Sequence, residues 1–114
     1  MVEDEPLFRV DCDWCGECVL LPSRWKHVLD HHPEVAPYVK EVEQTLRSPN
    51  LVYESRHRKA TRVFYARGLV TDHPFRDCYV AVCVRYKMEP SQVWTAYLPI
   101  NLSSNPGRLL YAAK

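Results

Sequence analysis

The chain has 114 residues, of which 46% are hydrophobic and 25% charged, a composition that is typical of a folded globular protein and excludes intrinsic disorder. Its 15 basic and 14 acidic residues leave a formal charge of +1, so affinity for nucleic acid or acidic lipid has to come from a local charged surface. We expect a single domain over residues 1–114 with one functional site.

The sequence predicts neither a membrane span nor an export signal. No apolar run reaches the roughly 18 residues that span a bilayer, and the start MVEDEP lacks the basic and apolar regions of a secretory signal. We therefore expect a cytoplasmic protein with no membrane partner. In that reducing environment the five cysteines are predicted to be thiols or metal ligands rather than disulfides.

Residues 7–21 are predicted to form a β-hairpin, because LFRVDC and CVLLP are short β-prone runs separated by DWCGE, whose glycine suits a tight reversal. A helix follows, with Ser23 placed to cap its start and Pro33 ending it. Its apolar face is predicted to hold Leu21, Trp25, Val28, Leu29 and His32, and another face Arg24, His27 and His31.

A second helix is predicted from about Glu34 to Arg47, and Pro37 is compatible with it only as part of the first turn. From Leu51 onward the hydrophobic period changes to two. The runs LVYES, ATRVFYA, CYVAVCVRY and SQVWTAYL predict four antiparallel strands. The tail NLSSNPGRLLYAAK begins as a polar loop and ends either as a short strand or as a disordered end.

These elements predict an α+β fold: an N-terminal β-hairpin, two α-helices, then a four-stranded antiparallel β-meander packed on the helices. Alternation predicts which side chains share a face in the last two strands. Val80, Val82 and Val84 are expected to oppose Tyr79, Ala81, Cys83 and Arg85, and Trp94, Ala96 and Leu98 to oppose Val93, Thr95 and Tyr97.

The strongest local charge lies in SRHRKATR, residues 55–62, which contains no acidic residue. Its cations are Arg56, Arg58, Lys59 and Arg62, and the aromatic residues Tyr53, Phe64 and Tyr65 flank it. Cations beside aromatic rings suit single-stranded nucleic acid, whose phosphates and bases they bind. The alternative is a solvated hairpin tip.

His27 and His31 lie four residues apart on one helical face, which is a spacing for two metal ligands. However, HVLDH lacks the glutamate of the metalloprotease pattern HExxH, which disfavours that class. Histidines also act as acid and base at neutral pH without a metal. The alternative is that they are surface or capping residues, with His32 closing the helix.

Two further patterns have both a chemical and a structural interpretation. Cys12, Cys15 and Cys18 form C-x2-C-x2-C, which needs a fourth ligand to make a closed zinc site; otherwise they are small hydrophobic residues. Thr95 and Tyr97, in WTAY, place two hydroxyls on one strand face, where they can bind a phosphate or simply belong to an amphipathic strand.

The segments RWKHVLDHHPE, TLRSPNLVYES, a tyrosine-bearing strand, YVAVCV and VWTAY follow one another over roughly residues 19–98. This series resembles the barnase, EndoU, colicin and RelE group of metal-independent ribonuclease folds, in its phage-type (PBECR-like) branch. The matching positions are Trp25, His27, His32, Pro33, Glu34, Thr95, Ala96 and Tyr97. The cysteine hairpin departs from the family pattern, which leaves a lineage-specific metal site open.

The resemblance implies an RNA-cleaving or RNA-binding domain with helices on one side of a curved antiparallel sheet, and an antitoxin or immunity protein as a candidate partner. We interpret the chain as a ribonuclease-like domain that needs no metal, in which a ribose 2′-hydroxyl attacks the adjacent phosphate. The predicted catalytic residues are His27 as acid or base, Arg62 as phosphate stabiliser, and Thr95 and Tyr97 as positioning hydroxyls. The predicted substrate-binding residues are His32, Arg56, Arg58, Lys59 and Tyr65.

Two alternatives remain open from the sequence. One is a non-catalytic module that binds RNA or protein through the same basic strand. The other is a small zinc protein organised by Cys12, Cys15 and Cys18.

Overall fold

The computed structural model describes residues 5–102 and 106–114. The first four residues of MVEDEP and part of the polar loop predicted near the C-terminus lie outside the described residues. The elements in chain order are β1 (Phe8–Cys12), β2 (Gly16–Leu20), α1 (Pro22–His31), the 3-10 helix η1 (Pro33–Tyr38), α2 (Val39–Arg47), β3 (Leu51–Ser55), β4 (Thr61–Arg67), β5 (Tyr79–Arg85), β6 (Ser91–Tyr97) and β7 (Gly107–Ala112). The predicted α+β class is confirmed.

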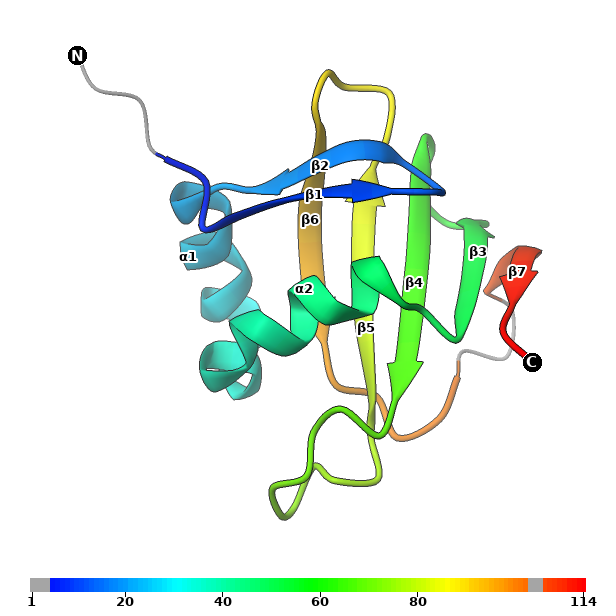
Figure 1. Ribbon diagram of the computed structural model, residues 1–114. Coiled ribbons are helices and arrows are strands. Elements are labelled where there is room, and N and C mark those ends of the chain that lie inside the picture. Colours follow the sequence, from blue (N-terminus) through cyan, green and yellow to red (C-terminus); the bar gives the residue numbers. More distant parts are fainter. Residues whose placement is uncertain (1–4, 103–105) are drawn as a thin grey trace.

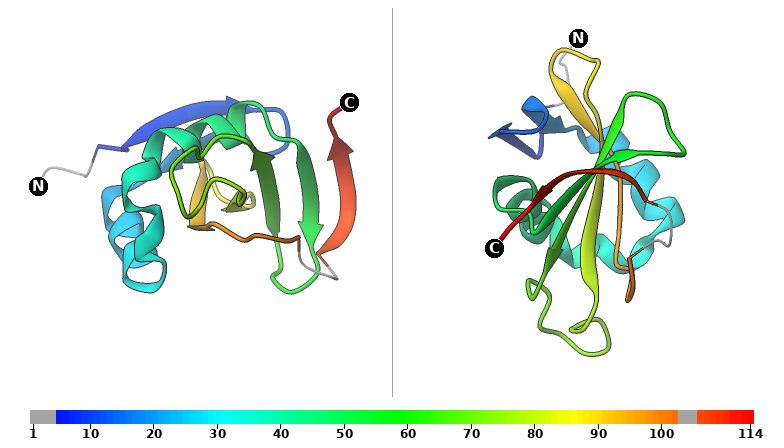
Figure 2. Two further views of the ribbon diagram at one scale, coloured as in Figure 1. Left: turned by 90° about the horizontal axis from the view of Figure 1, so that it is seen from below. Right: turned by 90° about the vertical axis from the view of Figure 1, so that its right-hand side faces the viewer.

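The sheet has seven strands in the order β1-β2-β6-β5-β4-β3-β7, rather than the four that the sequence predicts. The predicted strands β3 to β6 are antiparallel neighbours, but the hairpin joins them through a short parallel pairing of β2 with β6, and β7 pairs with β3. The predicted sheet had too few strands because the edge strands of the meander have unpaired backbone groups, which a further strand on each side satisfies. Figure 2 shows β7 at the end of the sheet opposite α1.

Prolines account for the two errors in the predicted helices. Ser23 does not cap α1: Leu21 occupies the cap position without a side-chain bond, and the helix starts at Pro22, two residues earlier than a Ser23 cap would place it. The second predicted helix is divided into η1 and α2. An α-helix starting at Glu34 would need the N–H of Pro37 for its first backbone bond, and proline has none.

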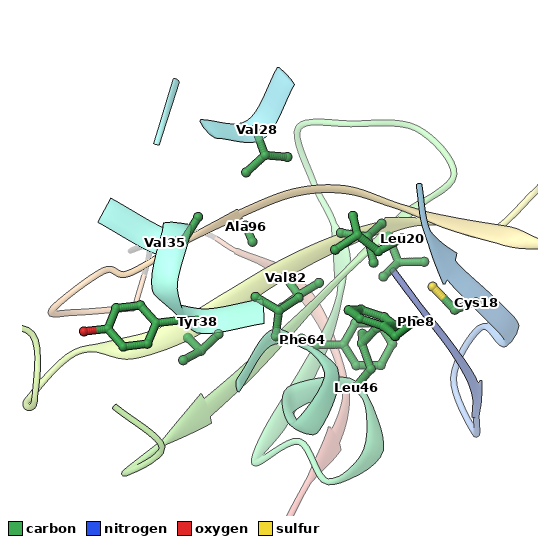
Figure 3. Close-up of a cluster of buried hydrophobic side chains, with 14 of the residues drawn as sticks. Phe8, Cys18, Leu20, Val28, Val35, Tyr38, Leu46, Phe64, Val82 and Ala96 are labelled. Atoms are coloured by element: carbon green, nitrogen blue, oxygen red, sulfur yellow. The ribbon is translucent and has the colours of Figure 1, made fainter. Parts of the chain in front are cut away.

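One face of the sheet is buried under the helices and the hairpin. Figure 1 shows α2 and the β1–β2 hairpin crossing this face of the strands. The predicted face of Val80, Val82 and Val84 is fully buried here, as is Phe64 from β4. The close-up in Figure 3 shows side chains from the hairpin, both α-helices and the strands meeting in this core: Phe8, Cys18, Leu20, Val28, Leu46, Phe64 and Val82.

The alternation predicted for β6 is wrong for two residues, Val93 and Trp94. In β6, Val93 is buried in the same core as Ala96 and Leu98, whereas Trp94 is only partly buried. The pairing of β5 with β6 shifts between Cys83 and Val84, so that Trp94 has no partner of its own. A bulge of this kind adds one residue and reverses the alternation beyond it.

Phe64→Ala is expected to lower the free energy of unfolding by about 3–5 kcal/mol, because it removes a ring that is 0% exposed at the centre of the core. Leu109→Ala is a control on β7, where the side chain is 50% exposed, and should change that free energy by no more than about 0.5 kcal/mol. Chemical denaturation measures both. Equal losses would contradict this description of the core.

Candidate functional site

The other face of the sheet carries a second, smaller cluster of aromatic and apolar side chains. Val63 and Tyr65 of β4 lie beside Ala81 and Cys83 of β5, and Tyr97 of β6 packs against them. This face remains partly open because the helices and the hairpin are packed on the opposite side of the strands. It therefore provides a firm floor on which polar groups can be held.

Two adjoining cavities lie on this face, and together we call them the groove. The first, of about 360 Å³, is lined by His32, Ser55, His57, Arg58, Val63, Tyr65, Cys83, Thr95, Tyr97 and Pro106. The second, of about 230 Å³, lies between α1 and β6 and is lined by Arg24, His27, Val28, His31, His32, Arg58, Trp94 and Thr95. His32, Arg58 and Thr95 line both cavities and so mark their junction.

His32 follows the last residue of α1 and is held on two sides. Its ring lies 5.5 Å from that of Tyr97, centroid to centroid, and its Nδ1 atom is 3.6 Å from Oε2 of Glu34. At this distance the two atoms are outside hydrogen-bond range, so the carboxylate acts on the ring through its charge. With a proton on Nδ1, Nε2 is able to accept one, and such an imidazole can act as a general base.

The floor of the first cavity holds groups that stay protonated at neutral pH. Burial is the main cause that raises the pKa of the Tyr97 hydroxyl far above its ordinary value, and burial also raises that of Tyr65. Burial likewise raises the pKa of the Cys83 thiol to about 11. Tyr97 can thus donate a hydrogen bond to an anion in the cavity.

Arg58 comes from the β3–β4 turn, whose start is fixed by Ser55. The Ser55 Oγ atom accepts hydrogen bonds from the backbone N–H groups of His57 and Arg58, at 3.2 and 3.1 Å. Arg58 lines both cavities, and its positive charge lowers the pKa values of Tyr97 and Cys83 against the larger effect of burial, which raises them. Arg58 is thus the cation of the turn that reaches the groove.

The structure does not bring the remaining predicted cations into the groove. Arg56 lines a separate depression beside Gly107 and Arg108, and Lys59 is exposed and lines neither cavity of the groove. Both side chains are exposed on the β3–β4 turn, where they contribute positive charge to its surface.

Arg62 lies on the opposite face of the sheet, and the prediction that it shares a site with Thr95 and Tyr97 is corrected. Its Nε donates to Glu54 at 3.1 Å and its Nη1 to the carbonyl of Trp14 at 2.7 Å. Tyr65 faces the groove, and a residue three positions away in a strand must face the other side. Arg62 therefore ties the hairpin to the sheet.

Sequence reasoning missed several residues that line the groove: Arg24, Ser55, His57, Cys83 and Trp94. Alternation would have found two of them, because Ser55 shares a face with Tyr53, and Cys83 was already expected opposite the buried valines. Arg24 and Trp94 depend on the docking of α1 and on the bulge, for which the sequence carries no signal.

The cysteine hairpin is part of the core. Cys12 and Cys18 are buried there and Cys15 is partly buried. The pKa of Cys12 is raised, mainly by a hydrogen bond with the Cys15 thiol and to a smaller extent by burial. Over residues 5–102 and 106–114, no group of three or more His, Cys, Asp or Glu side chains is arranged to hold a metal ion. Zinc at this hairpin stays a hypothesis.

Comparison of the chain with models of known protein families, with curated proteins and with solved structures finds no match. Within the described part of the chain, no helix is both long and apolar enough to cross a membrane. The function has to be argued from the groove itself.

Arg62→Gln is expected to lower the free energy of unfolding by about 1–3 kcal/mol, because it leaves Glu54 and the Trp14 carbonyl without their charged donor. Arg58→Gln is the matched control from the same basic segment, and its exposed side chain should contribute no more than about 0.5 kcal/mol. Urea denaturation of both variants tests whether Arg62 stabilises the fold while Arg58 contributes little to its stability. A larger loss for Arg58→Gln would contradict it.

Cys83 is expected to make stability depend on pH in the alkaline range. Below pH 9 the thiol is protonated in both states; between 9 and about 11 only the unfolded chain loses the proton, so the free energy of unfolding falls. The fall attributable to Cys83 should approach about 1.4 kcal/mol per pH unit at most. The free energy of unfolding is measured for wild type and Cys83→Ala from pH 8 to 11, and the difference between the two isolates the contribution of the thiol. A difference that stays constant with pH would contradict the raised pKa of Cys83.

Proposed function

We propose that the chain is a small endoribonuclease that binds RNA in the groove, as the resemblance to the barnase, EndoU, colicin and RelE group implies. The observation that supports this best is the junction of the two cavities, where an oriented imidazole, a guanidinium and a hydroxyl come from three separate segments: His32, Arg58 and Thr95. These are the groups that transfer within a phosphodiester requires: a base, a cation and a hydrogen-bond donor.

In this proposal the phosphate that is cleaved lies at the junction. Arg58 offsets its negative charge, and Thr95 and Tyr97 donate hydrogen bonds to its non-bridging oxygens. A neighbouring base lies in the first cavity over the aromatic floor that includes Tyr65. This assignment gives Arg58 the role that the sequence suggested for Arg62.

The reaction proposed is attack of the ribose 2′-oxygen on the adjacent phosphorus. His32 takes the proton of the 2′-hydroxyl, the new 2′-oxygen–phosphorus bond forms, and the bond from phosphorus to the 5′-oxygen breaks. His27, which lines the second cavity with His32, gives the departing 5′-oxygen a proton. The products are a 2′,3′-cyclic phosphate and a 5′-hydroxyl, and the roles of acid and base need no metal.

His32→Ala and His27→Ala are each expected to lower the rate of RNA cleavage by about 10²–10⁴-fold, with the fold retained. A substrate with a p-nitrophenyl leaving group needs no acid, so it should restore cleavage by His27→Ala and not by His32→Ala. His73→Ala, an exposed histidine of the β4–β5 connection, is the control and should cleave at the wild-type rate. Product analysis by mass spectrometry, with a chelator present throughout, provides the measurement.

Two outcomes would count against the proposal. Wild-type rates in both His32→Ala and His27→Ala would remove these histidines from the reaction. Absence of any cleavage by the wild-type protein, together with RNA binding that weakens with salt, would leave the non-catalytic module as the function, since binding alone releases counterions without breaking a bond.

A further inference from the structure

Trp94, the bulged residue of β6, lies between two arginines from different elements. The guanidinium carbon of Arg24, in α1, is 3.7 Å from the centroid of the Trp94 ring, and that of Arg85, at the end of β5, is 3.8 Å from it. Two guanidinium groups so close to one centroid cannot share a face, so they occupy opposite faces of the indole. Arg24 also donates from Nε to the Trp94 carbonyl at 2.9 Å, which fixes the stack to the strand.

The stack brings the positive charges of Arg24 and Arg85 together, and within the described residues neither forms an ion pair with a carboxylate. The ion pairs found in the described part of the chain involve none of Arg24, Arg58 and Arg85. Burial, then the charges of Arg85 and Arg58, lowers the pKa of Arg24, so Arg24 lies within the field of both other cations. The indole stabilises each cation through its π face but neutralises none of them.

The stack also adjoins the groove. Arg24 and Trp94 line the second cavity, which reaches the junction through His32, Arg58 and Thr95. The second cavity is thus the space beside the junction that an adjacent phosphate of a bound RNA strand would occupy. An anion there would supply the counter-charge that the protein itself does not provide.

We propose that the Arg24–Trp94–Arg85 stack is a second phosphate site, which binds a phosphate of the RNA strand next to the one that is cleaved. This inference rests on the proposed function of the groove and extends it to the substrate class. The shortest substrate that occupies both the junction and the stack is an RNA strand of three nucleotides, because two phosphates are needed.

Binding can be measured separately from cleavage with a 2′-O-methyl RNA of mixed sequence, which has no 2′-hydroxyl to attack. Arg85→Gln and Arg24→Gln should each reduce the slope of log Kd against log salt by up to about 0.7, the value for the loss of one phosphate contact on a single strand. Arg67→Gln is the matched control: Arg67 also stacks on an aromatic ring, 5.1 Å from the centroid of Tyr79, but outside the groove, and its slope should equal that of wild type.

Cleavage supplies the second readout. For trinucleotides, which carry two phosphates, both variants should raise KM about tenfold or more at nearly constant kcat. For dinucleoside monophosphates, which carry only the cleaved phosphate, they should change neither constant. Arg85 is exposed, so Arg85→Gln keeps the test open if Arg24→Gln, which loses its backbone bond, does not fold.

The outcomes separate the two proposals. Cleavage by wild type with unchanged salt slopes and unchanged trinucleotide KM in Arg85→Gln would overturn the second phosphate site and leave the ribonuclease standing. Reduced slopes in a protein that cleaves nothing would support the phosphate site and overturn the ribonuclease. Absence of RNA binding by wild type would overturn both.

Discussion

One-sided burial of the sheet is the constraint from which the rest of the structure follows. The helices and the hairpin cover the face that carries Phe64 and the buried valines of β5, such as Val82. Because successive side chains of a strand point to opposite sides, this burial also holds Tyr65 and Tyr97 in place on the other face. The core on one face of the strands therefore anchors the backbone of the residues that line the groove on the other face.

The same constraint divides the arginines into two groups with different consequences. Arg62 is on the helix side, where a carboxylate and a carbonyl surround it and its charge is used to hold the hairpin. Arg24, Arg58 and Arg85 are on or beside the groove, and none of them takes part in an ion pair within the described residues. A charged side chain that is paired stabilises a fold, whereas a group of unpaired like charges favours an anionic ligand.

A single bulge, at Trp94 in β6, determines which side chain of that strand lines the second cavity of the groove. Without it, strict alternation would bury Trp94 and expose Val93; with it, Val93 stays in the core and the indole becomes available to arginines from α1 and β5. The cation–π contacts of Trp94 and the bond from Arg24 to its carbonyl thus depend on one unpaired residue. The histidines at the end of α1 reach the groove because the helix packs against β6, and their positions follow from the packing of that helix.

The sequence by itself determined the hairpin, the strands β3 to β6, the α+β class and the faces of β5, because hydrophobic period and turn residues act locally. It also located the basic turn, the histidine cluster and the hydroxyls of Thr95 and Tyr97, since these are runs of neighbouring residues. Only the tertiary structure decided that the hairpin and β7 extend the sheet, that His32 and Arg58 meet at the junction, and that Arg62 does not. Strand pairing, helix docking and the bulge join residues far apart in the chain, and such contacts depend on the free energy of the whole fold rather than on any local pattern.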